Sequence, residues 1–499
     1  MSLSATLNTA STSLATNAAL STLVARNIAG VNDPNYSRKS AELVTTVGSG
    51  SVSVGTTRRA ADAAVLAKLL SANGDAASAK AMADGLDRIE STVNLTATAT
   101  AAGATATDTS PSTLLAALQS ALQTYAATPS NQAAGQAVVS AAKTLTANLN
   151  GASATVQSVR AGADAGIVAS VKTVNGLLGQ YATADAAVQR ATATGTDATD
   201  ALDTRDAILK QLSGEVGIVT VPSAGGSLSI YTDSGVTLFQ DTPRTVAVTA
   251  TTAFAAGSVG SAVTIDGVDV TGPGSPMPIR SGTLFGLAQL RDTTTVAYQN
   301  QLDQVAQGLI SAFADTDQTN GGAPPIAGLF TAPGSSTAQG SATAGVAGLI
   351  TVNANVDPSQ GGKITRLRDG NTGDPGNSAY NANPGNNASY AGHLQALLTS
   401  FGAARSFDPA SGGSDTGSIT AYADSSISWL EARRKDATAI ATSSSATQTA
   451  AVSSLSNATG VNLDDELLKM TDLEHSYSAS AQLLSTVKSM FDTLLSAVR

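Results

Sequence analysis

The stretch NLDDELLKMTDLEHSYSASAQLLSTVKSMFDTLLSAV, residues 462–498, carries an apolar seam with heptad spacing. A seam sustained over several heptads predicts a helix that packs as a coiled coil. Asn462 is a favourable N-cap, and the acids at 464–466 fall in the first turn, where the helix dipole stabilises negative charge. Glu466 and Ser480 are the polar members of the seam, whose apolar members are Leu463, Met470, Leu473, Tyr477, Leu484, Val487, Phe491, Leu494 and Val498.

A second seam of the same kind lies at the other end of the chain. Its members follow three- and four-residue spacing, which places them on one face of a helix. We expect this helix to stop near Gly30, because glycine is the favoured residue just past a helix end, and a loop to begin before Pro34. Asn17 and Ser21 interrupt the stripe, which otherwise contains Leu3, Leu7, Ala10, Leu14, Val24 and Ile28.

Neither seam can be buried by its own helix, so the simplest solution is to pair the two ends and to pack the pair against neighbouring copies. The pattern leaves parallel and antiparallel pairing open. Residues 1–40 carry three cations and one acid, a net charge of +2, and residues 461–499 carry three cations and six acids, a net charge of −3. Exposed ion pairs contribute only about 0–1 kcal/mol each, so the apolar seams matter more. The alternative is that both are ordinary surface helices of their own domains.

Composition restricts the function. The chain has 499 residues, 13% of them charged, a net charge of −10 and no cysteine. The absence of cysteine excludes disulfides and cysteine-based zinc sites. No basic face suited to nucleic acid is visible, and we expect no membrane-spanning segment. The first residues lack the basic and apolar regions of a cleavable secretory signal.

The fold class that we expect is mainly α with inserted β domains, in an elongated chain of several domains. Residues 1–45 form the N-terminal helix and loop, which pair with 458–499 as a terminal coiled-coil domain. Residues 46–213 form a helical domain completed by 284–320 and 392–457. The period-two pattern and the Asp266-Gly267 turn signal predict a β-rich domain over 214–283. Residues 321–391 form a loop and β insertion with one strand, 349–352.

The sequence offers little for catalysis or metal binding. His393 and His475 are the only histidines, and metal ligation needs three or four convergent donors. We expect no catalytic residue, no metal site and no cofactor, and regard the turn-associated acids Asp266, Asp269, Asp369 and Asp374 as structural. The run 433–435 is either a solvated basic face or an intersubunit contact.

The segment NIAGVNDPNYSRK, residues 27–39, resembles the N-terminal signature of bacterial flagellar axial proteins, Asn-Ile-Ala-Asn-x-Asn-Thr-x-Gly-Tyr-Ser-Arg. The tail GVNLDDE, residues 460–466, is similar to the C-terminus of the hook-associated protein 1 family, and segments near 125–150, 201–218 and 282–309 resemble its helical domain. Gly30 stands where Asn is usual, and 33–35 where Thr-x-Gly is usual; Asn35 tolerates a positive φ and would preserve the loop. The matching positions are Asn27, Ile28, Ala29, Asn32, Tyr36, Ser37 and Arg38.

This resemblance implies an extracellular structural protein of the flagellum, without enzymatic activity, that forms a ring of its own copies between hook and filament. It implies contacts with hook protein on one side and with the second junction protein or flagellin on the other, export by the flagellar type III system without signal cleavage, and a chaperone on the C-terminal helix. Tyr36 and Arg38 either contact neighbours or staple the loop to the first helix. The expected assembly interface comprises Leu3, Leu7, Leu14, Val24, Asn27, Ile28, Asn32, Tyr36, Arg38, Asn462, Leu463, Met470, Leu473, Tyr477, Leu484, Val487, Phe491 and Leu494.

Two alternatives stay open at this point. The chain could be another flagellar axial protein, namely hook protein, flagellin or the second junction protein. It could also be an adhesin or a cell-wall hydrolase with flagellar-type ends, in which case the activity would lie in residues 214–391.

Overall fold

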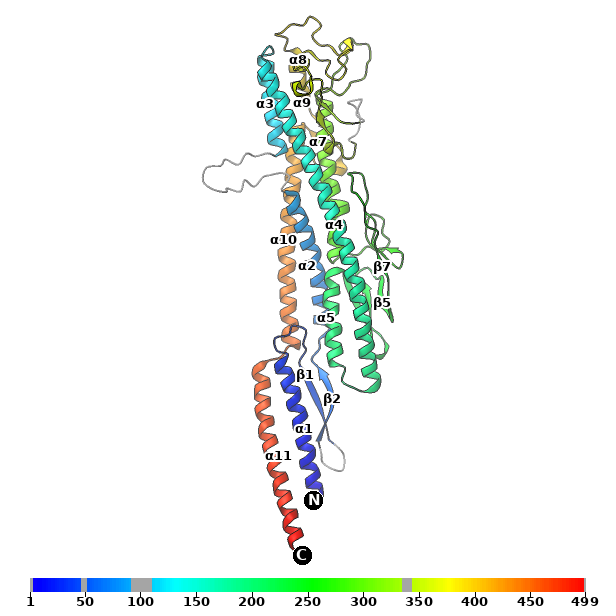
Figure 1. Ribbon diagram of the computed structural model, residues 1–499, viewed down its shortest axis with the longest axis vertical. Helices are drawn as coiled ribbons and strands as arrows, with labels where there is room; N and C mark the ends of the chain where they lie inside the picture. The colour runs from blue at the N-terminus through cyan, green and yellow to red at the C-terminus, as the bar shows by residue number, and fades with distance from the viewer. Residues whose placement is uncertain (1–2, 46–51, 91–109, 334–342, 498–499) are drawn as a thin grey trace, which may run out of the picture.

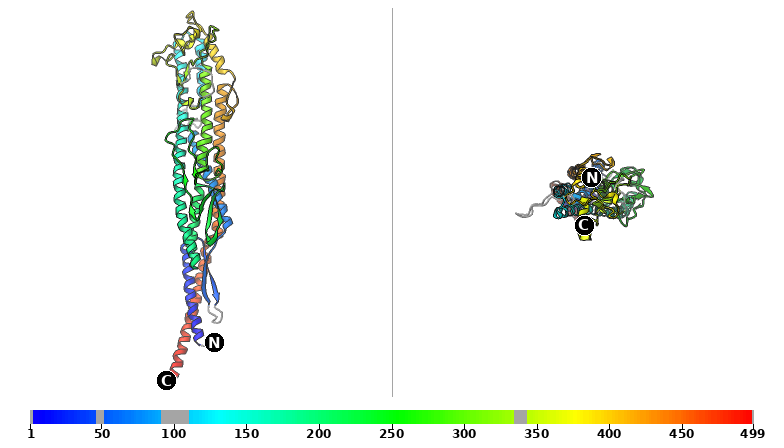
Figure 2. Two further views of the ribbon diagram at one scale, coloured as in Figure 1. Left: turned by 90° about the vertical axis from the view of Figure 1, so that its right-hand side faces the viewer. Right: turned by 90° about the horizontal axis from the view of Figure 1, so that it is seen from above.

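The computed structural model describes residues 3–45, 52–90, 110–333 and 343–497. It is mainly α-helical and strongly elongated, and both chain ends lie at the same tip (Figure 1). Two parts are distinguished below. The terminal unit comprises residues 3–59 and 463–497, and the body comprises residues 63–459. In the side view, the terminal unit continues the long axis of the body (Figure 2).

Long helices run along the body. Asn131 caps the longest of them through hydrogen bonds from the backbone N–H groups of Ala133 and Ala134, and Gly195 ends it in the left-handed conformation. This helix has 63 residues and is therefore about 95 Å long at 1.5 Å per residue. The long body helices are α2 (Ala63–Glu90), α3 (Pro111–Ala127), α4 (Gln132–Thr194), α5 (Thr199–Glu215), α7 (Thr295–Ala312) and α10 (Ile419–Thr459).

The body is held by two large apolar clusters. One joins α3, α4, α7 and α10 with the short helix α9 (Gly392–Gly402), and includes Leu122, Leu309 and Phe401. The other lies between α4, α5 and the sheet that follows α5, and includes Tyr181 and Phe239, whose rings meet edge to face. The helix expected from 422 to 457 is α10, which begins slightly earlier and carries Tyr422 in the first cluster.

Small antiparallel sheets cover one side of α4. A four-stranded sheet has the order β3-β4-β5-β6, and a three-stranded sheet has the order β7-β8-β9. The expected turn at Asp266-Gly267 is present, and both residues have positive φ, as a tight hairpin turn requires. The strands are β3 (Ile218–Pro222), β4 (Leu228–Thr232), β5 (Thr237–Gln240), β6 (Thr242–Pro243), β7 (Val246–Ala247), β8 (Thr264–Ile265) and β9 (Val268–Asp269).

A buried ionic cluster ties these loops to the helices. Arg160 of α4 donates to the backbone carbonyls of Ala255 and Ser258, and Arg291 pairs with Asp164. Arg291 lies in a π-helical turn, η2 (Leu290–Thr294), between α6 (Thr283–Gln289) and α7. Because a buried charge is tolerated only when it is paired and hydrogen-bonded, the cluster fixes where the loop lies.

The segment from 314 to 391 has little regular structure. The strand expected over 349–352 is wrong in its extent: β11 covers only Thr351–Val352, pairs with β10 (Phe330–Thr331), and leaves Leu349 exposed. Asp315 accepts hydrogen bonds from the backbone N–H groups of Thr372 and Gly373, which pins the loop to the end of α7. This region also contains the short helix α8 (Thr365–Asp369), and after α9 the strands β12 (Arg405–Ser406) and β13 (Thr416–Gly417) pair with each other.

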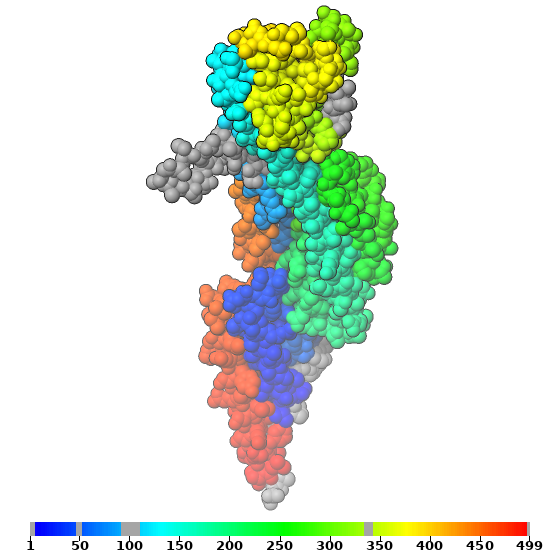
Figure 3. Space-filling view, turned by 45° about the horizontal axis from the view of Figure 1, so that its top comes forward, coloured from blue at the N-terminus to red at the C-terminus, as the bar shows by residue number. Residues whose placement is uncertain are grey.

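The terminal unit consists of α1 (Leu3–Ala29), α11 (Leu463–Ala497) and a hairpin of β1 (Lys39–Thr45) and β2 (Val52–Arg59). The domain assignment from the sequence, with helix and loop over 1–45, did not include this hairpin, because Gly and Thr dilute the strand pattern of β2. The hairpin packs on α1, where Thr16 Oγ1 donates to Val52 O at 2.7 Å. In the space-filling view, α1 and α11 lie against each other (Figure 3).

Candidate functional site

The two chain ends form an antiparallel helix pair, which resolves the orientation that the sequence left open. Ser13 faces Ser480 at 3.0 Å between the two hydroxyl oxygens, and Asn17 Nδ2 donates to Ser476 Oγ at 2.9 Å. Four residues forward on α1 thus correspond to four residues back on α11. Each of the interruptions Asn17 and Ser480 therefore faces a serine of the other helix, and polar pairs of this kind specify register in helix pairs.

Burial along α1 and α11 follows the predicted seams but is incomplete. Val24, Asn27 and Val487 are buried, and Leu14, Ile28, Met470, Leu473, Leu484 and Phe491 are partly buried. The side chains that remain exposed in the single chain are Leu7, Asn32, Asn462, Leu463, Tyr477 and Leu494. The side chain of Leu3 and the whole of Val498 lie outside the described residues.

Asn27 is the centre of the contacts at the upper end of the pair. Its Nδ2 donates to Lys39 O and to Glu466 Oε2, both at 2.9 Å. Its Oδ1 accepts from Lys39 N and from the hydroxyl of Tyr36, again both at 2.9 Å. A primary amide offers two donors and two acceptor positions, and all four are used. Asn27 therefore joins α1, the following loop, β1 and α11 through one buried side chain.

Glu466 is the matching group on α11. Its side chain is 1% exposed and accepts from Asn27, from Arg38 Nε at 2.9 Å and from Lys469 Nζ at 2.8 Å. Burial alone would raise the pKa of Glu466, but the hydrogen bonds from Asn27, Lys469 and Arg38 outweigh it and hold the pKa below its usual value. We call Asn27, Tyr36, Arg38, Glu466 and Lys469 the end node.

Within the single chain, Tyr36 and Arg38 act as staples, one of the two roles considered for them. Tyr36 bonds to Asn27, and Arg38 to Glu466. Burial raises the pKa of Tyr36 to about 12, with smaller contributions from nearby charges, so its hydroxyl remains a donor at neutral pH. Asn462 also acts locally, since its Oδ1 accepts from Asp464 N at 3.0 Å and caps α11 as expected.

The first helix ends at Ala29, as the expected stop near Gly30 requires, but the expected conformation of Asn35 was wrong. Neither Gly30 nor Asn35 has a positive φ, so glycine at position 30 is not explained by a left-handed helix end. A Cβ at Gly30 would instead lie 2.5 Å from the ring of Tyr36. Gly30 is required because the aromatic ring packs directly on its backbone. Sequence spacing could not show this contact, because it depends on how the loop folds back.

The sequence analysis missed the main partner of the N-terminal cations. Arg26, Lys39 and Arg59 all pair with acids just before and along the first half of α5, namely Asp197, Asp200, Asp203 and Asp206. We call these four acids the acid ladder. Of the three N-terminal cations counted in the charge comparison, only Arg38 pairs with α11. The feature of the sequence that could have indicated this partner is the three-residue spacing of the acids, which makes them neighbours on a helix surface.

Exposed apolar side chains gather on α11. A single exposed Leu is ordinary, but many large apolar side chains exposed on one helix indicate an interaction surface. We call this group the α11 stripe; its members are Leu463, Leu467, Leu468, Tyr477, Leu483, Met490, Leu494 and Leu495. The last turn of α11 also extends beyond the start of α1 (Figure 1), so the final members of the stripe have no partner helix in the single chain.

The residues considered for chemistry lie elsewhere and are separated from one another. Burial lowers the pKa of His393 to about 4, and this histidine lies 4.0 Å from Asp315. His475 is exposed on α11. Arg434 pairs with Asp87, Glu90 and Glu431 within the chain. Among the described residues, no group of three or more acids, histidines or cysteines could hold a metal ion.

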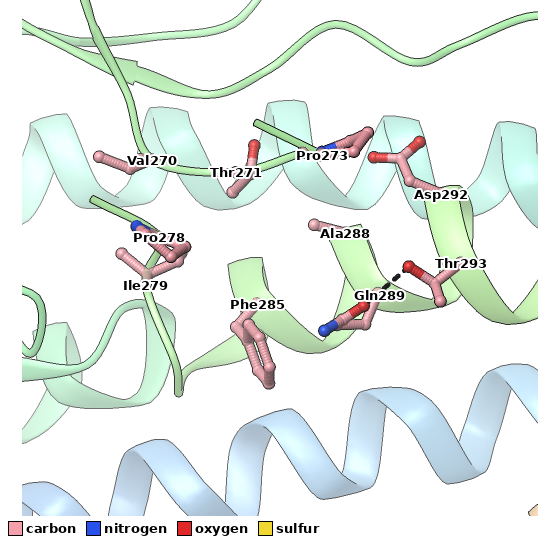
Figure 4. A pocket seen from close by; sticks show the side chains of 11 residues that line it. Val270, Thr271, Pro273, Pro278, Ile279, Phe285, Ala288, Gln289, Asp292 and Thr293 are labelled. Carbon is pink, nitrogen blue, oxygen red and sulfur yellow. Dashed lines mark hydrogen bonds between the residues drawn. The ribbon is translucent and has the colours of Figure 1, made fainter. Parts of the chain in front are cut away.

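A shallow cavity of about 240 Å³ lies between the loop 270–279 and the α6–η2 segment. Figure 4 shows Phe285, Ala288 and Gln289 facing Pro273 and Pro278 across it. Gln289 bonds to Thr293, and Asp292 pairs with Arg291. The polar groups therefore serve the protein's own structure, and the cavity shows no arrangement suited to catalysis. No described helix is both long and apolar enough to cross a membrane.

Comparison with known proteins gives two family matches. Residues 100–323 match the flagellar hook-associated protein FlgK helical domain, and residues 453–497 match the flagellar basal body rod FlgEFG protein C-terminal family. The second match coincides with α11 and the end of α10. These matches confirm the resemblance to hook-associated protein 1 that the sequence indicated. Among curated proteins, no sequence matches the chain.

One solved structure, the flagellar hook junction protein FlgK from Burkholderia pseudomallei, matches 53% of this chain and 46% of its own length. The sequence identity is 21% and the TM-score is 0.42. The match therefore spans less than half of that protein.

Proposed function

We propose that this chain is a structural component of the bacterial flagellum that forms the junction ring between hook and filament. The observation that carries the proposal is the α11 stripe: the paired ends leave large apolar side chains exposed, on the helix that matches a flagellar C-terminal family. Burying one such side chain contributes about 1.5–3 kcal/mol. Several of them on each copy supply enough free energy for stable association between copies.

In this proposal, the terminal units of neighbouring copies pack together as coiled coils around the flagellar axis, and the bodies point outward. The assembly interface consists of the seam and motif residues named from the sequence, with Leu467, Leu468, Leu483, Met490 and Leu495 added to it from their exposure. Residues 214–283 and 321–391 form outer domains. The body lies on the other side of the end node, so it can remain folded while the ends change partners.

The partners follow from the position in the organelle. One face of the ring contacts hook protein, and the other contacts the second junction protein or flagellin. The chain reaches this extracellular position through the flagellar type III system without signal cleavage. Before export, a chaperone covers the α11 stripe, because an amphipathic helix with exposed apolar side chains is the natural ligand of a hydrophobic groove. The role is structural and non-enzymatic.

Deletion of the gene from its host tests the proposal. We expect cells with hooks but without filaments, and flagellin released into the medium. A complementing variant with Leu483, Met490 and Leu494 replaced by Ser should fail to restore filaments, and a control variant with Ser478 and Ser489 replaced by Ala should restore them. Normal filaments on the deletion strain would refute the junction role. Long polymers of the purified chain alone would favour hook protein or flagellin instead.

A further inference from the structure

The connection between the terminal unit and the body is polar. No hydrophobic cluster formed by the described residues includes a member of the terminal unit. The terminal unit contacts the body mainly at α5, where ion pairs from α1, β1 and β2 reach it, and at Thr459 at the end of α10. Packed apolar cores resist relative motion, and that resistance is missing here. Whatever holds the two parts in line must come from the chain connections and from polar contacts.

Both chain connections converge on one residue. Residues 60–62 join β2 to α2, and residues 460–462 join α10 to α11. Arg38 N donates to Thr459 O at 2.8 Å, and Arg38 O accepts from Ala60 N at 2.7 Å. The backbone of Arg38 thus touches both connections at once. This arrangement gives a compact pivot, because two short links that meet at one point allow rotation but little translation.

The acid ladder lies across a cavity from this pivot. Arg26 Nη2 is 2.7 Å from Asp200 Oδ2 and 40% exposed, so this outer rung faces solvent. The inner rungs are more buried: Lys39 pairs with Asp200 and lies 3.7 Å from Asp203, while Arg59 contacts Asp203 at 3.1 Å. A cavity of about 170 Å³ is lined by Asp206 of the ladder and by Ala60 and Thr459, the two residues bonded to the backbone of Arg38.

We infer that this joint is a latched hinge: the terminal unit pivots at Arg38, and the ion pairs between the acid ladder and Arg26, Lys39 and Arg59 hold it in line with the body. The end node lies inside the terminal unit, so the helix pair stays intact when the latch opens. This inference concerns the single chain and does not depend on the proposed place in the flagellum.

The chain contains no cysteine, so introduced cysteine pairs can be spin-labelled specifically for distance measurement by electron–electron double resonance. One pair spans the hinge, with Ala19→Cys on α1 and Ala186→Cys on α4. A second pair lies within the terminal unit, with Ala19→Cys and Ser489→Cys on α11. All three positions are exposed. Each pair is placed in the parent, in the double variant Asp200→Asn/Asp203→Asn and in the control Asp84→Asn, which removes an exposed ion pair to Lys80.

We expect the double variant to broaden and shift the hinge-spanning distance distribution, while the distribution within the terminal unit stays narrow. The control should match the parent in both. Raising the salt from about 0.05 M to about 1 M screens the exposed outer rung, so it should broaden the hinge-spanning distribution of the parent without any substitution. An unchanged hinge-spanning distribution in both the variant and high salt would overturn the inference. Equal broadening of the distance distributions of both label pairs would also overturn the inference, because α1 and α11 would then have separated from each other.

Discussion

Leu309 of α7 lies fully buried in the larger cluster of the body, whereas Leu494 of α11 faces solvent in the terminal unit. Both parts are built from long helices with apolar seams. Most apolar side chains of the described body helices are buried against other parts of the same chain, although Ile440 and Val452 of α10 are exposed. In the terminal unit, the two helices share one narrow interface, with polar pairs at intervals along it. The difference supports the proposal that the terminal unit is completed by other copies, whereas the large clusters of the body form within one chain.

The largest expected contrast is between two leucine truncations. Leu309→Ala should lower the free energy of unfolding by about 2–5 kcal/mol, because it creates a cavity in a packed core. Leu494→Ala should change it by less than about 0.5 kcal/mol, because the side chain is exposed, yet it should weaken assembly. Urea unfolding of the monomers and sedimentation of the assembled protein measure the two effects. Equal destabilisation by both substitutions would break the contrast.

Glu466→Ala should weaken the terminal unit alone. The substitution removes one of the two buried hydrogen bonds of Asn27 Nδ2, which should lower the stability of the terminal unit by about 1–3 kcal/mol. Hydrogen exchange should therefore accelerate in residues 463–475 and 20–29 and remain unchanged in α4. Glu474→Ala, at an exposed position of the same helix, is the matched control and should leave both regions unaffected. Faster exchange throughout the body would mean that the stabilising effect of the end node is not confined to the terminal unit.

Glycine-to-alanine changes should have opposite signs in the two parts. Gly30→Ala places a Cβ against the ring of Tyr36 and should destabilise the terminal unit by roughly 1 kcal/mol, the low end of the overpacking range, because the loop can shift. Gly179→Ala in α4 meets no atom within 4 Å and should stabilise the body by about 0.5–1 kcal/mol through its helix propensity. Segment-resolved hydrogen exchange reports each part separately, and a stabilising Gly30→Ala would contradict the contact with Tyr36.

Acid should loosen the terminal unit through Glu466. Its pKa is lower in the folded chain than in the unfolded chain. Its stabilising contribution is therefore fully present above the unfolded pKa and is lost as the pH falls through the folded pKa. The distribution of distances between spin labels at positions 19 and 489 should broaden when the pH falls below the ordinary pKa of a glutamate. The Glu466→Gln variant should lack this component of the response; an identical pH profile in the variant would argue against the assignment.

The sequence predicted the seams of both ends, and the structure pairs them, because the heptad period is a property of the residues themselves. The relative direction of the two helices was not predictable, since a seam is compatible with parallel and with antiparallel pairing. Asn17 and Ser480 were recognised only as interruptions, and their pairing with Ser476 and Ser13 depends on the register. The contact between Gly30 and Tyr36 could not be foreseen either, because it forms between residues that the loop brings together.

The acid ladder shows a different kind of omission. Its spacing is visible in the sequence, but charge counting over the two ends assigned the N-terminal cations to α11. Lys39 instead reaches α5, which is more than 150 positions away in the chain. A net charge carries no information about which surface lies nearby. The β1–β2 hairpin, which places Arg59 beside Asp203, had to be known first, and its second strand is weakly patterned.

Hydrogen exchange of the free chain against the assembled ring tests the central claim most directly. The account predicts that residues 3–29 and 463–497 exchange faster than α4 in the free chain and become more strongly protected on assembly, while α4 is equally protected in both states. Equal protection of the two ends in the free and assembled states would contradict it, because the seams would then need no neighbouring copy.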